Sequence, residues 1–411
     1  MTPRLAYLCG EYPRATDTFI QREVAALRRA GLPVETISVR RPAQREQGSE
    51  EQRQERENTH YLLPCSPWRL LADHARLLFS TPVRYCRGVG LALTVRAPGL
   101  RALIYQLFYF AEAGLLAQRM RQRGLTHIHN HAPDASGYVT MLAAQLGNLT
   151  YSLTLHGFGI LSEPSRWRLQ DKIKRSLFTI GVSKHARSQA MLWSDRSCWD
   201  RLHVVHCGIV PQQTAPDTVR QHAGRGKRLL FVGRFDHVKG LPVLLEAFAL
   251  IAANDPEVHL DLVGDGPERP DLEALVREKG LEKRVMFPGY RSQEELEEYF
   301  SRADVFVITS FAEGIPVVLM EAMSRGVPVV APRITGIPEL VEEGINGLLT
   351  APADIDDLVR CLSDLLYDPN LRNRLAAEGR RKVEEHFNIN TETGRLVKIM
   401  RSYLKDHPDN S

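Results

Sequence analysis

The feature of this sequence that most restricts its fold is the regular alternation of short apolar runs with longer segments of helical periodicity. The apolar runs predict six strands in each half of the chain: 4–9, 34–39, 126–129, 150–155, 178–182 and 202–206, then 228–233, 258–263, 284–287, 304–309, 327–330 and 347–350. Helical patterns fall between them, at 17–30, 100–122, 134–146, 165–177, 242–252, 270–279, 293–302, 316–325 and 354–367. This alternation is typical of parallel α/β folds.

The chain has 411 residues, which is too long for one ordinary core and predicts two domains. A stretch rich in Pro, Gly and Gln breaks the pattern near residue 208. We therefore expect a first doubly wound domain at 1–207, a linker at 208–227, a second at 228–385 and a terminal helix at 386–411, with the first domain as a candidate packing partner for that helix. We interpret the polar stretch 41–60 as a long exposed loop. Two such domains would place a cleft between the carboxyl ends of both sheets.

Composition and charge narrow the class of protein. Hydrophobic residues make up 43% and charged residues 25%, as in soluble globular proteins. A formal charge of +4 does not indicate a nucleic-acid-binding protein. The six cysteines have no paired spacing, which favours reduced thiols in a cytoplasmic protein. The first apolar run is too short for a signal peptide, and no uninterrupted run of about 18 apolar residues occurs, so we expect no membrane span.

Charge is concentrated in one otherwise apolar and aromatic segment, residues 61–125. It contains nine arginines and only two carboxylates, Asp73 and Glu112, for a net charge of +7. Residues 103–110 read Leu-Ile-Tyr-Gln-Leu-Phe-Tyr-Phe. Two interpretations stay open: a surface that binds an anionic membrane, or a buried helix pair with solvated arginines.

The second domain opens with a strand, a short loop and a helix. The strand ends at Gly233, Arg234 and Lys239 flank the loop, and Pro242 suits the first turn of the helix. Free N–H groups at a helix start, together with two cations, suit a diphosphate. A plain βα turn with two solvated cations explains the same residues.

Two carboxylates stand eight residues apart in Glu313-Gly-Ile-Pro-Val-Val-Leu-Met-Glu321. We expect Pro316 at the first position of a helix, which places Glu313 in the loop over the helix start. Glu321 then lies five residues further, about 7.5 Å along the axis. Such a pair could hold hydroxyls at the two ends of a sugar nucleotide, provided that Arg234 and Lys239 balance the charge of the diphosphate.

Histidines mark the strand ends of the first domain. His156 follows the strand 150–155, where it is a candidate for catalysis or sugar contact, or a structural histidine. His127, His129 and His131 suggest a metal site, but we expect no acidic or cysteine ligand near them and therefore no metal there. Asp354 and Asp356 mimic a metal-binding D-x-D motif, yet at a helix start capping explains them better.

Together these segments resemble the family 4 retaining glycosyltransferases, which have the GT-B fold of two doubly wound Rossmann-like domains facing across a cleft. The segments that carry the resemblance are Gly233-Arg234 with Lys239-Gly240, Val263-Gly264-Asp265-Gly266, Glu313 to Glu321, Gly326 to Ala331, and Gly336 to Gly347. Glu313 and Glu321 match the E-x7-E signature of the family. Five such segments in the right order cover the whole second domain.

The resemblance implies sugar transfer from a nucleoside diphosphate sugar to an acceptor hydroxyl, with retention, without a metal and without a cofactor other than the donor substrate. By analogy, Arg234 and Lys239 would clamp the diphosphate and Glu321 the ribose hydroxyls. Glu313 would act at the reaction centre, together with His156, and would hold the donor sugar with the backbone of the next four residues. The full donor-binding set is Gly233, Arg234, Lys239, Tyr290, Gly314, Ile315, Pro316, Val317 and Glu321.

The first domain resembles one subgroup, which builds bacterial exopolysaccharides such as colanic acid. The resemblance lies in residues 11–20, in His129-Asn130-His131, in Thr154 to Gly157 and in Val204 to Gly208. Many family members carry paired glycines after the first strand, whereas only Gly10 is present here. We therefore assign Arg14, Asp17, Thr18 and His131 to the acceptor side.

The expected acceptor is a glycan or a polyprenyl-linked oligosaccharide, and no nucleic acid is expected as a partner. The expected location is the cytoplasm or the cytoplasmic face of the membrane. The alternatives are a sugar-nucleotide-binding subunit without catalysis, or a nucleotide-sugar epimerase of the same fold.

Overall fold

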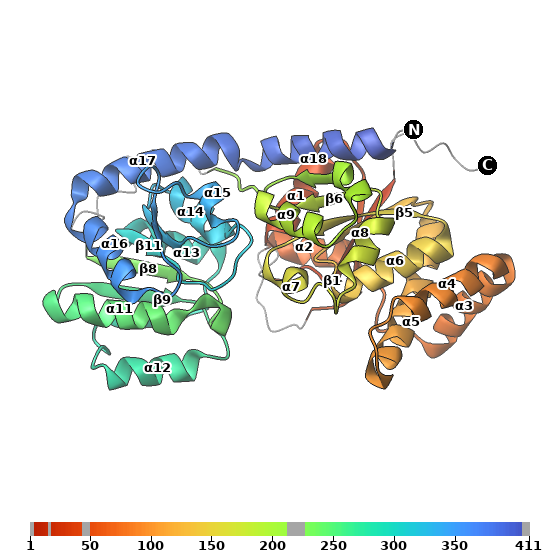
Figure 1. The fold of residues 1–411 in the computed structure, drawn as a ribbon, viewed down its shortest axis with the longest axis horizontal. Coiled ribbons are helices and arrows are strands. Elements are labelled where there is room, and N and C mark those ends of the chain that lie inside the picture. The colour runs from red at the N-terminus through yellow and green to blue at the C-terminus, as the bar shows by residue number, and fades with distance from the viewer. Residues whose placement is uncertain (1–3, 15–17, 43–49, 212–226, 405–411) are drawn as a thin grey trace. The chain divides into compact units, whose positions relative to one another are not determined.

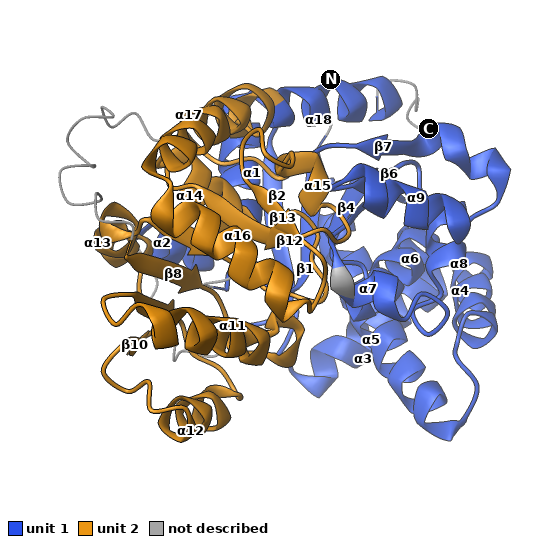
Figure 2. Cartoon of the chain, turned by 60° about the vertical axis from the view of Figure 1, so that its left-hand side comes forward, with its two compact units in different colours: residues 1–206, 392–411 blue, residues 207–391 orange. Residues whose placement is uncertain are grey.

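The computed structural model describes residues 4–14, 18–42, 50–211 and 227–404. The chain divides into two compact units, and each is described here by itself. Unit 1 comprises Met1–His206 and Glu392–Ser411, and unit 2 comprises Cys207–Thr391 (Figure 2). Most of the expected linker, 208–227, lies outside the described residues.

Unit 1 is built on a seven-stranded parallel sheet with the order β3-β2-β1-β4-β5-β6-β7. The strands are β1 (Leu5–Glu11), β2 (Val34–Arg40), β3 (His60–Tyr61), β4 (His127–His131), β5 (Thr150–Leu155), β6 (Thr179–Gly181) and β7 (Leu202–Val204). The central strands are buried along nearly their whole length, because helices cover both faces of a parallel sheet. The strand order reverses between β1 and β4.

Nine α-helices before residue 193 and one at the end of the chain belong to the described part of unit 1 (Figure 1): α1 (Thr18–Arg29), α2 (Glu50–Asn58), α3 (Pro67–Ser80), α4 (Pro82–Thr94), α5 (Leu100–Arg123), α6 (Ala135–Gly147), α7 (Phe158–Ser162), α8 (Leu169–Arg175), α9 (Lys184–Leu192) and α18 (Ile389–Leu404), whose first three residues fall in unit 2. A 3-10 turn covers Arg196–Arg201. The expectation of a loop over 41–60 is wrong where the structure describes it. Glu50–Asn58 is a helix, and Arg28 and Thr36 hold it through hydrogen bonds to Glu55.

The terminal helix α18 packs in the core of unit 1. Leu396, Val397 and Met400 lie in the same apolar cluster as Leu5 and Val24. Polar contacts add to this packing, because His203 Nε2 lies 3.0 Å from the Tyr403 hydroxyl and the buried Glu392 carboxylate accepts a hydrogen bond from the His206 backbone N–H. The terminal helix begins at Ile389 rather than at the expected residue 386, which is the last residue of α17 of unit 2.

Helix α5 is the part of the described chain that bears on the expectation of no membrane span. Its 24 residues include an 18-residue window with a mean hydropathy of 1.2, which is long and apolar enough to cross a membrane by length and composition. The expectation considered only uninterrupted apolar runs, whereas this window tolerates isolated polar residues. The second half of the helix, from Ala113 to Met120, is buried in the core of unit 1. Of the apolar window as a whole, 39% is buried.

Unit 2 is built on a six-stranded parallel sheet with the order β10-β9-β8-β11-β12-β13. The strands are β8 (Arg228–Val232), β9 (His259–Val263), β10 (Val285–Gly289), β11 (Val305–Val307), β12 (Val329–Pro332) and β13 (Leu348–Thr350). The helices are α11 (Leu241–Asn254), α12 (Arg269–Glu278), α13 (Gln293–Arg302), α14 (Val317–Ser324), α15 (Ile337–Leu340), α16 (Ile355–Tyr367) and α17 (Pro369–His386). The strand order reverses between β8 and β11.

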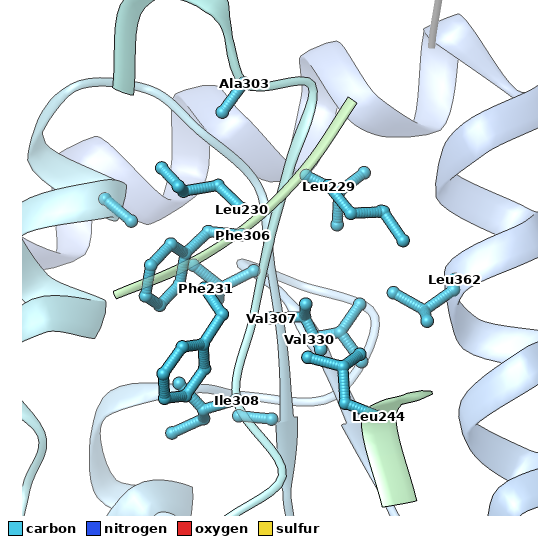
Figure 3. Packing of buried hydrophobic residues seen from close by; sticks show 14 of the residues in the cluster. Leu229, Leu230, Phe231, Leu244, Ala303, Phe306, Val307, Ile308, Val330 and Leu362 are labelled. Atoms are coloured by element: carbon cyan, nitrogen blue, oxygen red, sulfur yellow. The ribbon is translucent and has the colours of Figure 1, made fainter. Parts of the chain in front are cut away.

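Local signals account for where several of these helices begin. Ser292 and Glu295 form a capping box at the start of α13. Asp354 caps α16 by accepting a hydrogen bond from the Asp357 N–H at 2.9 Å, which confirms that the acidic pair there is a capping motif. Buried side chains from β8, β11, β12, α11 and α16 form the core of unit 2 (Figure 3).

Candidate functional site

The expected donor residues of unit 2 gather where its strand order reverses, at the carboxyl ends of β8 and β11. In open α/β sheets this switch point is where ligands bind, because the loops from the two strands diverge there. The loop after β8 contains Gly233 to Gly240, and the loop after β11 contains Ser310 to Pro316. Lys239 Nζ contacts Glu313 Oε1 at 2.6 Å, and the Ser310 hydroxyl donates to the same oxygen at 2.7 Å. The structure thus joins two residues that are 74 positions apart.

Close backbone packing holds these two loops together. The Thr309 hydroxyl lies 3.1 Å from the Lys239 carbonyl oxygen and 3.0 Å from that of Gly240. The Phe311 N–H donates to the Val238 carbonyl at 2.7 Å. Gly240 adopts φ +60°, and a Cβ there would stand 2.4 Å from the Thr309 carbonyl oxygen. The position of Lys239 is therefore set by main-chain contacts that only glycine permits at position 240.

Helix α14 begins directly after the loop that carries Glu313. Pro316 is its N-cap, so the helix begins at Val317, one residue after the expected start, and no side chain caps it. Its first N–H groups are thus available to an anion, with the helix dipole in their favour. Glu321 is buried in the same helix, at 5% exposure. Gly314, Ile315 and Val317 complete the loop and the first turn, and Ile315 is buried.

The remaining donor candidates lie at the same edge of the sheet. The Arg234 side chain is 65% exposed, with its Nε 3.8 Å from Asp236 Oδ2. Tyr290 directly follows β10 and is 53% exposed. The loop after β9 packs closely against Gly233, since a Cβ on Gly264 would stand 1.8 Å from the Gly233 carbonyl oxygen. The edge therefore presents an exposed cation beside the partly buried Lys239.

In unit 1, the structure brings His131 and His156 together at the carboxyl ends of β4 and β5, next to the point where the strand order reverses. His131 Nδ1 lies 2.9 Å from His156 Nε2, and the two rings stack with centroids 5.1 Å apart. On its other side, His131 Nε2 lies 3.1 Å from Glu23 Oε1, which also accepts a hydrogen bond from the Tyr7 hydroxyl at 2.8 Å. Burial lowers the pKa of His156 well below its ordinary value, and the neighbouring His131 lowers it further.

The expectation that no acidic ligand lies near the histidines of β4 is wrong in three dimensions. Ligand atoms of Glu23, His129 and His131 lie within 4.8 Å of one another. However, His129 bonds the hydroxyls of Ser152 and Thr154 at 2.7 and 2.8 Å, and both ring nitrogens of His131 have partners as well. A metal would have to displace these hydrogen bonds. The cluster therefore fits a hydrogen-bonded chain better than a metal site.

The other acceptor-side candidates lie around the start of α1. Thr18 is the first residue of this helix, and the exposed Arg14 accepts a hydrogen bond from Gln21 through its carbonyl oxygen. Asp17 lies outside the described residues. Gly10, in β1, has open space around the position of a Cβ.

Three residues of these clusters were missed by the sequence interpretation: Ser310, Glu23 and Tyr7. Ser310 directly follows a buried apolar run, and this position at a strand end was the only signal for it. Glu23 stands four residues after Phe19 on α1, so both side chains lie on one helix face. Phe19 contacts the His156 ring at a centroid distance of 4.8 Å. Nothing local shows that this helix face meets β4.

Comparison with known proteins identifies the family. The model of the family described as "Glycosyl transferases group 1" matches residues 216–382. The D-inositol 3-phosphate glycosyltransferase of Corynebacterium urealyticum is 30% identical over 311 residues, which cover 69% of this chain and 73% of that protein. The chain belongs to the group 1 glycosyl transferases. Within that family, it is also 31% identical over 207 residues to an amylovoran biosynthesis glycosyltransferase of Erwinia amylovora, covering 49% of this chain and 51% of that protein.

The chain thus spans only about half the length of some curated relatives that it matches. Solved structures show the fold of this glycosyl transferase. The HepE protein of Anabaena in complex with UDP-glucose is 19% identical, has a TM-score of 0.71, and is matched over 97% of this chain and 99% of that one. This likeness, together with the two parallel sheets, shows the GT-B fold with its two doubly wound domains.

Proposed function

We propose that this protein is a retaining glycosyltransferase that moves a sugar from a nucleoside diphosphate sugar to a hydroxyl of a glycan or polyprenyl-linked oligosaccharide, in the synthesis of a surface polysaccharide or exopolysaccharide. The observation that carries the proposal is the cluster of Lys239, Glu313 and Ser310 at the switch point of unit 2, directly before the uncapped start of α14. The amylovoran relative and the UDP-glucose complex of the structural neighbour support the same class of acceptor and donor.

The diphosphate of the donor would lie at the start of α14. Backbone N–H groups of the first turn would bind its oxygens, and Lys239 and Arg234 would balance its charge. As the sugar leaves, charge grows on the diphosphate, so these fixed donors would stabilise the transition state more than the ground state. In this role Lys239 would divide its hydrogen bonds between the phosphate and Glu313, since an ammonium group has three protons to donate.

The donor sugar would be held by Glu313. Its Oε1 accepts from Lys239 and Ser310, and no described residue donates to Oε2, which leaves that oxygen for sugar hydroxyls. Glu321, one turn deeper, would hold the ribose. In the reaction the bond from the anomeric carbon to the diphosphate breaks, and a bond to the acceptor oxygen forms on the same face. The leaving phosphate would take the acceptor proton, so the step needs no metal or cofactor and retains the anomeric configuration.

The substitution Glu313→Gln tests this assignment. We expect donor turnover, measured as nucleoside diphosphate release and sugar transfer over a panel of donor sugars, to fall about 10- to 100-fold, because hydrogen bonds to a charged group are lost. The matched control is Glu246→Gln, which removes a similar lysine pair, Lys279–Glu246 at 2.7 Å, elsewhere in unit 2. Equal turnover in wild type and Glu313→Gln would contradict the role. Donor binding without turnover in the wild type would favour a non-catalytic subunit.

The same proposal includes an anionic membrane as the surface on which the acceptor is carried. Helices α3, α4 and the first half of α5 pack together beside α6 (Figure 1). We call their outer face the basic apolar surface. Its exposed apolar side chains are Trp68, Leu71, Leu78, Phe79, Val83, Val89, Leu93, Leu100, Ile104, Tyr105, Leu107 and Phe108. Trp68 and Phe79 are 79% and 84% exposed, and large aromatic residues with this exposure mark interaction surfaces when they cluster.

Charge favours a membrane as the partner of the basic apolar surface. Six arginines lie on these helices or the connection between them: Arg69, Arg76, Arg84, Arg87, Arg96 and Arg101. The two carboxylates of the segment are buried, since the Asp73 and Glu112 side chains are 3% and 7% exposed and both pair with arginines. Within residues 61–125, all of which the structure describes, no exposed carboxylate thus opposes an anionic lipid surface, where each cation contributes about 1 kcal/mol. The protein would then act on the cytoplasmic face of the membrane.

A further inference from the structure

The histidines at the carboxyl ends of β4 and β5 belong to a chain of hydrogen bonds. The direction of these hydrogen bonds determines whether His156 donates to the ligand or accepts from it. The chain runs from Tyr7 through Glu23 and His131 to His156, with successive distances of 2.8, 3.1 and 2.9 Å. Each internal contact can in principle run either way, because a neutral histidine has one N–H donor and one acceptor nitrogen. The two ends of the chain decide between the alternatives.

The Tyr7 end makes Glu23 an acceptor. Burial raises the pKa of Tyr7 well above its ordinary value, and the negative charge of Glu23 raises it further, so the hydroxyl keeps its proton and donates it. A carboxylate has no proton to give, and Glu23 Oε1 is the oxygen shared by Tyr7 and His131. His131 must therefore donate to Glu23 through its Nε2–H. A His131 ring that carries this single proton offers a lone pair on Nδ1.

His156 completes the chain as a donor. Its Nε2 faces the lone pair on His131 Nδ1, so the proton of a neutral His156 lies on Nε2 and its Nδ1 carries a lone pair. The depressed pKa of His156 agrees with a neutral ring. No described residue donates a hydrogen bond to that Nδ1. The ring is also held in orientation, because Phe19 of α1 contacts it while His131 stacks on it.

We infer that His131 is singly protonated and that Glu23 and His131 are positioning residues that hold His156 as its Nε2–H tautomer, so that a hydroxyl of the ligand donates a hydrogen bond to His156 Nδ1. This inference rests on the proposed function and deepens it. A lone pair on Nδ1 attracts a sugar hydroxyl and disfavours a phosphate or carboxylate oxygen. His156 would then bind a neutral group that bears hydroxyls, whereas the cations of unit 2 would bind the diphosphate.

Histidine NMR on the full-length protein tests the inference without relying on activity. With 15N-labelled histidine, long-range 1H–15N spectra distinguish the two neutral tautomers, and the His156 signals are identified by their loss in His156→Asn. We expect the Nε2–H tautomer in the wild type. In Glu23→Gln, the amide can donate as well as accept, so the direction of the chain is no longer imposed and the Nδ1–H form of His156 should appear. Tyr7→Phe is the matched control, because Glu23 still accepts from His131.

The inference is overturned by an Nδ1–H tautomer in the wild type, or by an unchanged tautomer in Glu23→Gln. In the transfer assay, Glu23→Gln should lower kcat/KM about tenfold while the melting temperature stays near that of Tyr7→Phe. Sugar transfer by the wild type together with an unchanged tautomer in Glu23→Gln would remove the inference and leave the function. The expected tautomers with no transfer of any sugar would remove the function and leave the hydrogen-bonded chain.

Discussion

At the scale of single residues, the donor edge of unit 2 depends on glycines where loops from different strands meet. Gly264 adopts φ +140°, which is strained for any residue with a Cβ, and it packs against the Gly233 carbonyl oxygen. Gly233 immediately precedes Arg234, and the same loop continues to Lys239. A side chain at position 264 would therefore displace the proposed phosphate-binding loop and would also lower the free energy of unfolding.

We expect Gly264→Ala to lower the free energy of unfolding by about 3 kcal/mol or more, because backbone strain and a clash at 1.8 Å add together. The control is Gly280→Ala, which has φ +65° but nothing within 4 Å of the new Cβ and should cost about 1 kcal/mol. Denaturant unfolding with a probe in unit 2 measures both. Equal losses in the two variants would show that the contact with Gly233 does not matter.

At the scale of elements, helices α3, α4 and α5 carry exposed apolar side chains that a folded domain ordinarily buries. The inner sides of these helices do pack, since His74 of α3 bonds the Tyr85 hydroxyl of α4 and the Ala111 carbonyl of α5 at 3.0 and 3.1 Å. The helices are thus fixed to each other, while their outer aromatic and arginine side chains have no apolar cover within the described part of unit 1. In residues 61–125 the helices pack together and several apolar side chains stay exposed, while binding to a membrane stays a prediction.

Replacing Trp68 and Phe79 together by serine should lower binding to vesicles rich in phosphatidylglycerol by at least about tenfold, because each aromatic side chain contributes roughly 1.5–3 kcal/mol on burial. Co-sedimentation measures the bound fraction. Phosphatidylcholine vesicles should bind more weakly than anionic ones, and 1 M salt should weaken binding to the anionic vesicles, since it shortens the Debye length to about 3 Å.

The control for this experiment is Met286→Ser, which removes a 54% exposed apolar side chain in unit 2 and should leave vesicle binding unchanged. Equal binding by the wild type and the double variant would contradict the membrane proposal. The same conclusion would follow if the wild type formed oligomers without vesicles and the double variant did not, because the surface would then contact a second copy of the chain.

At the scale of the whole molecule, the chain has separate cores in its two units, and its C-terminal end returns to complete the first. Met400 of α18 is fully buried among residues of β1 and α1, nearly 400 positions earlier in the sequence. Unit 1 therefore depends on residues after position 391, whereas the core of unit 2 comes from residues 207–391.

We expect Met400→Ala to destabilise unit 1 by about 2–5 kcal/mol, through lost apolar contacts and the cavity left behind. Hydrogen exchange followed by mass spectrometry should show faster exchange in peptides from β1 and α1, with little change in β8 and β11. Leu362→Ala, in the core of unit 2, is the reciprocal control and should give the opposite pattern. Uniformly faster exchange after Met400→Ala would show that the two cores do not unfold separately.

The regular elements could largely be read from the sequence, because strands and helices are marked by local periodicity and by caps. All six strands expected in unit 2 are present, with bounds shifted by a few residues at most. The prediction of a loop at residues 50–58 failed because the helix there has no local apolar signal. Residues 50–58 are so polar that they show no apolar face, yet Glu55 gains its hydrogen bonds from Arg28 and Thr36, far away in the sequence.

The sequence by itself determined the family, the α/β alternation and the candidate residues of the donor site, because motifs and periodicity are properties of neighbouring residues. Only the tertiary structure decided which of them meet. Lys239 reaches Glu313 because β8 and β11 are adjacent in the sheet, and Glu23 reaches His131 because α1 lies against the end of β4. Contacts across 74 and 108 residues depend on strand order, and strand order is set by the packing of the whole domain, which no local pattern encodes.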